Sequence, residues 1–233
     1  IRLFIIMQIE DNYILKQPAK KSDITVVVFS AVDCLPGQFH SVKALQNFDV
    51  NKVFVNCENN SWYIEGIPGL GRSWKEAATK LYEIAQKLTE TGSGTVLYFG
   101  GSMGGTGALL YGLYSKVDAI ISTGSEATFF KKGSYSANKF AGSEKIQIDW
   151  SKLISGYNGN LLMLYGDLEN VDREASLEFT SIDEKFEDAI YNIKNYGHRV
   201  PVFIAEKFGI KKFIELFLQE PETIINKIGN LND

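Results

Sequence analysis

The stretch TVLYFGGSMGG, residues 95–105, determines how this sequence is expected to fold. An apolar segment runs into glycines around Ser102, and a glycine-rich apolar segment follows. This is the pattern G-x-S-x-G between a strand and a helix. A turn this tight holds the serine in strained backbone geometry with its hydroxyl exposed, and glycine at positions 100 and 104 avoids collisions with the neighbouring strand and helix. The same pattern also fits a turn without chemistry that binds a phosphate at the helix N-terminus.

Apolar segments rich in β-branched or aromatic residues recur along the chain and predict strands. They are Asp23–Ala31, Lys52–Cys57, Thr95–Gly100, Asp118–Gly124, Asn160–Gly166 and Asp188–Asn195, and residues 1–10 predict a first strand before them. These segments are continuously apolar rather than alternating, as strands covered on both faces require. The sequence therefore predicts an α/β fold with a mostly parallel sheet flanked by helices on both faces.

Helical periodicity occupies three of the intervals around these strands. One helix begins after Ser73, a second begins at about Met103, and a third begins at Pro201 and continues to Leu218. Residues 125–160 show no long period. We expect this segment to be a cap or an insertion that shapes the entrance to a site.

The composition is that of an ordinary globular protein, with 233 residues, 45% hydrophobic and 22% charged. Without a repeat or a linker, residues 1–233 are expected to form a single domain. The net charge of −4 argues against a protein whose main function is to bind nucleic acid. No apolar run reaches the roughly 20 residues of a membrane span. Two cysteines are too few for a disulfide scaffold, so we expect a cytoplasmic protein; the sequence defines no oligomeric state.

Only two histidines, His40 and His198, are available as a base for Ser102. His198 follows the last predicted strand, which places it at the carboxyl edge of a parallel sheet, where the turn at Ser102 also emerges. We therefore expect His198 to be the general base and His40 to be a loop or substrate-contact residue. Cys34 and His40 form a rival nucleophile and base, but nothing in the sequence gives Cys34 a strained turn or a helix terminus.

A carboxylate is needed to orient the imidazole and to stabilise its positive charge. The acidic loop GDLENVD, residues 166–172, offers Glu169, Asp172 and Asp167, in that order of preference. Glu169 is preferred because its longer side chain can reach across a loop gap to the histidine.

An oxyanion needs two preorganised backbone N–H groups. We expect one from Met103, directly after the serine. The other is expected from Ala31, where small residues end the strand Asp23–Ala31.

The segments GGSMGG, GDLENVD and NYGHRVP, each after a predicted strand and in the order Ser, acid, His, resemble the α/β-hydrolase superfamily. The resemblance covers residues 23–219. Within the superfamily, VVVFSA, FGGSMGGTGALLYGL and YGDLEN are similar to a bacterial group found with capsule and cell-surface polysaccharide genes, which includes carbohydrate O-acetyltransferases and accessory-secretion acetylation proteins. The resemblance implies Ser102 as nucleophile, His198 as base and Glu169 as acid. Use of Glu departs from the commoner Asp and keeps Asp172 as the alternative, and FSA stands in place of the HGGG oxyanion motif.

The sequence therefore predicts a serine acyl-transfer enzyme, either an esterase or an O-acetyltransferase. Its substrate would be an ester or thioester of a small molecule or carbohydrate, such as a bacterial surface polysaccharide or glycoprotein. No metal site and no cofactor-binding residue is indicated, and acetyl-CoA is compatible as the acyl donor. The alternative is a non-catalytic binding or assembly module of the same fold in a polysaccharide or secretion complex.

Two further patterns leave a functional and a structural interpretation open. The lysines of the insertion could meet an anionic polysaccharide or the phosphates of coenzyme A, or could form a solvated face; they are Lys131, Lys132, Lys139, Lys145 and Lys152. Trp62 and Tyr63, before the loop GIPGLG, could form a platform for a sugar ring or belong to an ordinary loop.

Overall fold

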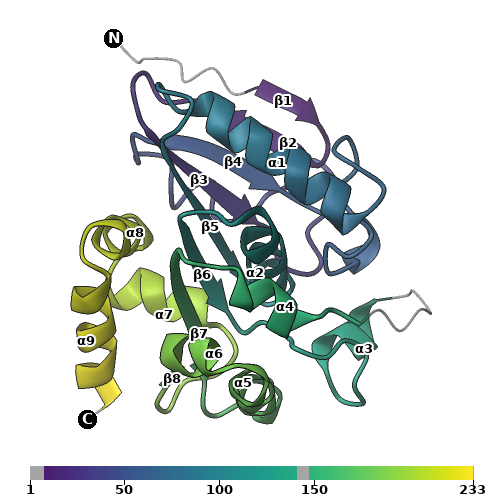
Figure 1. The fold of residues 1–233 in the computed structure, drawn as a ribbon, viewed down its shortest axis with the longest axis vertical. Coiled ribbons are helices and arrows are strands. Elements are labelled where there is room, and N and C mark those ends of the chain that lie inside the picture. The colour runs from purple at the N-terminus through teal and green to yellow at the C-terminus, as the bar shows by residue number, and fades with distance from the viewer. Residues whose placement is uncertain (1–7, 141–146, 233) are drawn as a thin grey trace.

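The computed structural model describes residues 8–140 and 147–232. Within these residues the chain forms an eight-stranded sheet in the order β1-β2-β4-β3-β5-β6-β7-β8 (Figure 1). The strands are β1 (Gln8–Asp11), β2 (Ile14–Gln17), β3 (Ile24–Phe29), β4 (Asn51–Val55), β5 (Thr95–Gly101), β6 (Ala119–Thr123), β7 (Asn160–Gly166) and β8 (Ile190–Ile193). The pairs from β4 to β8 are parallel, whereas β2 pairs antiparallel with both β1 and β4.

The central strands are apolar on both faces, as the sequence predicts. In β3, Val27 packs into the core on one face of the sheet and Val28 into the core on the other. In β5, Tyr98 and Phe99 divide between the same two cores. Since neighbouring residues of a strand point to opposite faces, two buried faces require a continuous apolar run.

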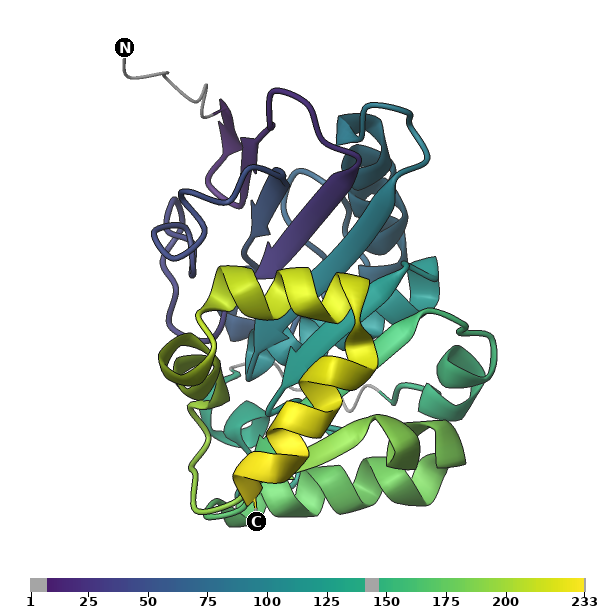
Figure 2. The same cartoon turned by 90° about the vertical axis from the view of Figure 1, so that its left-hand side faces the viewer.

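Helices supply the outer layers on both faces (Figures 1 and 2). One face carries α1 (Trp74–Leu88), α2 (Met103–Ser115), α4 (Trp150–Ser155), α5 (Asn170–Ile182) and α6 (Glu184–Ala189). The other face carries α7 (Val200–Lys207), α8 (Ile210–Gln219) and α9 (Pro221–Asn232). A short helix, α3 (Tyr135–Lys139), and a 3-10 turn, Glu58–Asn60, complete the described elements. Within the described residues, no helix is both long and apolar enough to cross a membrane.

The predicted strands and the helices at Ser73 and Met103 agree with the structure, apart from their ends. The third predicted helix does not run unbroken to Leu218, because it divides into α7 and α8 at Gly209. This glycine has φ of 73°, a left-handed conformation that interrupts the helix and that glycine adopts without a steric penalty. The first strand predicted over residues 1–10 is described only from Gln8 onward, and residues 1–7 and 141–146 lie outside the described residues.

Candidate active site

Ser102 occupies the sharp turn between β5 and α2. Its φ of 56° and ψ of −125° are strained for a residue with a side chain, and such geometry persists only where the surroundings enforce it. The two flanking glycines explain how the turn closes. A Cβ on Gly100 would lie 2.1 Å from the carbonyl oxygen of Gly104, and one on Gly104 would lie 2.3 Å from the carbonyl oxygen of Phe29. The steric argument made from the sequence is therefore confirmed.

His198 lies in the loop between β8 and α7, and its ring connects two side chains. Its Nε2 is 2.8 Å from Ser102 Oγ, and its Nδ1 is 2.6 Å from Asp172 Oδ1. The ionised carboxylate can only accept, so the Nδ1 carries the proton and donates it to Asp172. The Nε2 lone pair is left facing the serine hydroxyl, which donates to it. This is the geometry of a nucleophile, a base and an orienting acid.

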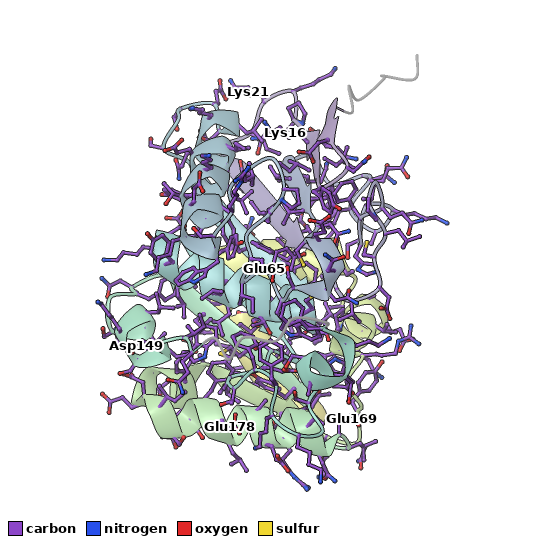
Figure 3. The ribbon with its side chains drawn as sticks, turned by 90° about the vertical axis from the view of Figure 1, so that its right-hand side faces the viewer. Lys16, Lys21, Glu65, Asp149, Glu169 and Glu178 are labelled. Carbon is purple, nitrogen blue, oxygen red and sulfur yellow. The ribbon has the colours of Figure 1, made fainter. Side chains whose placement is uncertain are left out.

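Asp172, and not Glu169, lies at His198, which corrects the preference drawn from the sequence. The supposed acidic loop becomes helical at Asn170, so Glu169 is the N-cap of α5 and Asp172 lies in its first turn. The helix turns Asp172 inward, where it is 2% exposed and its second oxygen accepts a 3.4 Å bond from the Gly166 amide. The Glu169 side chain, labelled in Figure 3, instead lies beside Gly197. Reach across a loop gap is thus not what selects the acid.

Asp167, the third candidate, does not contact the imidazole. Its backbone N–H donates to the carbonyl oxygen of Ile193, which fixes the turn after β7. Its side-chain Oδ1 is buried and has no partner among the described residues.

The backbone amides near Ser102 differ in availability. The Met103 N–H begins α2 and has no acceptor among the described residues, as expected for an oxyanion donor. The Ala31 N–H does not meet that expectation, because it donates to Nδ1 of His40 at 2.9 Å. The next amide, that of Val32, has no acceptor in the described part of the chain, and Val32 borders the same cavity as Ser102.

A cavity of about 350 Å³ opens beside Ser102 on the side of α7. Its walls are mostly apolar and are formed by Val28, Phe29, Val32, Phe99, Pro201 and Val202. The polar residues that border the cavity are Ser102 and His198 together with His40, Ser41 and Arg199. An apolar hollow with a few convergent polar groups is typical of a small-molecule site.

The rival pair of Cys34 and His40 lacks the geometry of a nucleophile and its base. The Cys34 thiol donates to the carbonyl oxygen of Gln38 at 3.1 Å, and burial raises its pKa, which disfavours the reactive thiolate. The His40 ring is partly open to solvent, yet desolvation by its surroundings lowers its pKa. Its Nδ1 is already occupied by the Ala31 amide.

Of the other two sequence patterns, the structure contradicts the aromatic platform, whereas a binding role of the lysines stays a prediction. Trp62 and Tyr63 are fully buried, so they form no exposed platform for a sugar. Lys131 pairs with Glu174 and Glu178 on α5, and Lys139 pairs with Asp33. Lys145 lies outside the described residues.

Sequence reasoning missed Val32, and it also missed Tyr135, whose ring stacks on His198. No motif marks either residue. The start of α5 did leave a signal, because the pattern NVDREASLEF spaces Val171, Ala175 and Phe179 at helical intervals. Applying that period would have placed Asp172 on a helix and not in a loop.

Comparison of the sequence with protein-family models and with curated proteins gives no match. Solved structures do match. The capsule O-acetyltransferase of Neisseria meningitidis serogroup A aligns over 84% of this chain and 90% of that one, with a TM-score of 0.66 and 17% identity. MenH from S. aureus aligns over 90% and 99%, with a TM-score of 0.56 and 13% identity. An α/β-hydrolase enzyme from a lagoon-sediment metagenome aligns over 89% and 96%, with a TM-score of 0.54 and 20% identity.

Proposed function

We propose that this chain, which has the α/β-hydrolase fold, is a serine acyl-transfer enzyme with Ser102 as nucleophile, His198 as base and Asp172 as the orienting acid. The observation that carries the proposal is the continuous hydrogen-bonded path from Ser102 Oγ through His198 to Asp172. A structural role alone does not explain why a serine in strained geometry borders a cavity. Nor does it explain why the hydroxyl of that serine meets the unprotonated nitrogen of an oriented imidazole.

The chemistry follows from these contacts. As Ser102 Oγ attacks the acyl carbonyl carbon, its proton passes to His198 Nε2, and Asp172 stabilises the imidazolium. The carbonyl oxygen becomes an oxyanion, for which the free amides of Met103 and Val32 are the proposed donors. When this oxyanion collapses, the bond between the acyl carbon and the leaving alkoxide or thiolate breaks. The leaving group takes the proton from Nε2, and the acyl group stays bound to Ser102 Oγ. His198 Nε2 then takes the proton of water or of an acceptor hydroxyl as that oxygen attacks the acyl carbon. When this second oxyanion collapses, the bond between the acyl carbon and Ser102 Oγ breaks and Nε2 returns the proton to Oγ.

Because the cavity beside Ser102 is mostly apolar, it suits an uncharged ester or thioester group better than a highly charged group next to the reacting carbon. The likeness to a capsule O-acetyltransferase, one of whose structures is a complex with CoA, supports transfer of an acetyl group from acetyl-CoA to a carbohydrate hydroxyl. The esterase reaction needs the same residues and differs only in the acceptor. A cytoplasmic location and an entrance-shaping role for residues 125–160 remain predictions beside this proposal.

Covalent labelling tests the nucleophile. A fluorophosphonate probe should add once to the wild type, measured by intact mass, because the oriented base activates a single serine. Ser102→Ala should give no adduct. Ser115→Ala, which removes a half-buried hydroxyl at the far end of the same helix, should label like the wild type. A folded wild type that is not labelled would instead support the non-catalytic binding module.

The adduct itself tests the oxyanion donors. In its crystal structure, the phosphonyl oxygen should accept bonds from the amides of Met103 and Val32 at about 2.7–3.1 Å. An oxygen bound to the Ala31 amide, with His40 displaced, would return the second donor to Ala31.

The acceptor is tested by following acetyl release from p-nitrophenyl acetate and from acetyl-CoA, with and without a saccharide. Faster release together with an acetylated sugar detected by mass supports the transferase. Release that no sugar changes supports the esterase.

A further inference from the structure

The imidazole of His198 is held by more than its two hydrogen bonds. The ring of Tyr135, the first residue of α3, stacks on it with centroids 4.1 Å apart and an interplanar angle of 26°. Gly124 lies against the imidazole as well, since a Cβ there would come within 2.9 Å of His198 Cε1. The His198 side chain is therefore only 17% exposed. The catalytic path described above gives Tyr135 no task.

A buried carboxylate holds the turn that carries Tyr135. Glu126 follows β6, is 4% exposed, and accepts a 2.9 Å bond from the Ser136 N–H and a second, shorter bond from the Ser136 hydroxyl. The same hydroxyl accepts the Phe130 N–H at 2.8 Å, and the Glu126 N–H donates to Thr106 Oγ1 on α2. The contacts tie the residue after Tyr135 to α2 and to the end of β6.

Glu126 has no lysine or arginine in contact among the described residues. Burial raises the pKa of its carboxyl, and the bonds from Ser136 partly reverse that effect. Burying a carboxyl without a cation is costly, so such a group is retained where its hydrogen bonds fix something that matters. Here they fix the turn that places an aromatic ring on His198.

We propose that Tyr135 is a positioning residue for His198, and that Glu126 acts through Tyr135 by anchoring Ser136. The proposal rests on the proposed function. The stacked ring limits rotation of the imidazole about its Cβ–Cγ bond and keeps Nε2 directed at Ser102 Oγ. It also shields the bond between His198 and Asp172 from water, which strengthens that bond. The phenol stays neutral, since burial together with the charges of Glu169 and Asp172 raises its pKa to about 12.

Proton NMR tests the placement without any enzyme assay. The chain has only two histidines, so untagged protein gives two imidazole Hε1 signals, and His40→Asn identifies which belongs to His198. A ring stacked at 4.1 Å shifts the His198 signal upfield. Tyr135→Ala should move it downfield, Tyr135→Phe should not, and Glu126→Gln should move it downfield as well because the neutral amide cannot accept both bonds from Ser136. A signal unmoved by Tyr135→Ala would overturn the placement, and a signal that Tyr135→Ala moves but Glu126→Gln does not would overturn the anchoring role of Glu126.

Kinetics test the consequence. Tyr135→Ala should lower kcat by about 10- to 100-fold with little change in KM, because a misplaced base slows the proton transfer rather than binding. Tyr135→Phe, which keeps an aromatic ring against His198, should retain most of the wild-type kcat. Tyr114→Ala removes a half-exposed tyrosine that meets Trp74 edge to face, far from His198 in the chain, and should match the wild type.

A double-mutant cycle tests the order of action. Glu126→Gln alone should lower kcat, and Tyr135→Ala combined with Glu126→Gln should lose little more than Tyr135→Ala alone, because Glu126 acts through the ring. Additive losses would overturn that link. If Glu126→Gln fails to fold, Ser136→Ala, which removes one of the two donors, takes its place in the cycle. If the wild type is not labelled but the His198 signal moves in Tyr135→Ala as expected, only the proposed function is overturned. If the wild type is labelled but Tyr135→Ala leaves kcat unchanged, only this inference is overturned.

Discussion

The two histidine-bearing loops at the carboxyl edge of the sheet use the same ring nitrogen in opposite ways. In the loop after β8, His198 Nδ1 donates to a carboxylate, so its Nε2 is a free base beside Ser102. In the loop after β3, His40 Nδ1 accepts the Ala31 amide, so its proton sits on Nε2. The partner at Nδ1 decides the tautomer, and the tautomer decides which ring can take a proton from an alcohol.

The largest expected effect separates the two rings directly. His198→Ala should lower kcat by about 10⁵- to 10⁶-fold, because the serine loses its only oriented base. Turnover of p-nitrophenyl acetate by purified variants measures it. A comparable loss in His40→Ala would mean that the opposite tautomers do not define the roles.

The acid is the next test. Asp172→Asn should lower kcat by about 10⁴-fold, because an amide can stabilise the wrong tautomer of His198. Glu169→Gln, at the N-cap of the same helix, should stay close to the wild type. The reverse ranking in the same assay would return the role to Glu169.

His40 should matter less, through the loop that it holds. His40→Ala should lower kcat/KM by about 2- to 10-fold, the effect of losing one net hydrogen bond on the segment that carries Val32. His40→Asn places an amide oxygen near the position of Nδ1 and should recover part of the loss. If His40→Ala is faster than the wild type, the ring obstructs the site instead of supporting it.

The smallest effect concerns pH. Because the pKa of His40 is lowered in the folded protein, the unfolded chain binds more protons just below the ordinary histidine value of about 6.5. The free energy of unfolding should therefore fall as pH drops through that range, and fall less in His40→Asn. Urea unfolding above and below this pH measures the difference. Equal slopes for the two proteins would show that desolvation of His40 is negligible.

Much of this architecture could be predicted, because two buried faces leave a continuous apolar pattern and the Ser102 turn leaves an obligatory glycine pattern. The strand β2, which pairs antiparallel with β1 and β4, escaped because its four residues are too few to leave a clear apolar run. The break at Gly209 escaped because the apolar period continues on both sides of it.

The site was predicted less completely than the fold. Ser102 could be placed because it follows β5 directly, and His198 because it lies in the short loop after β8, at the same edge of the sheet. The choice between Glu169 and Asp172 could not be made from side-chain length, since it depends on the rotation of a helix. The Ala31 N–H is not free because it donates to His40 across a loop, and no local sequence pattern predicts this contact.

Asp172 and His198 stand 26 positions apart on one continuous stretch of chain, which also holds α6, β8 and most of α5, whereas Ser102 lies earlier in the chain, between β5 and α2. One segment of the chain therefore carries both the acid and the base. Recombination with a homologous fold at points before Asp167 and after Arg199 would exchange acid and base together while keeping their mutual register. Grafts that split the stretch would combine an acid and a base from different parents, so the 2.6 Å contact between them would no longer be set by one segment.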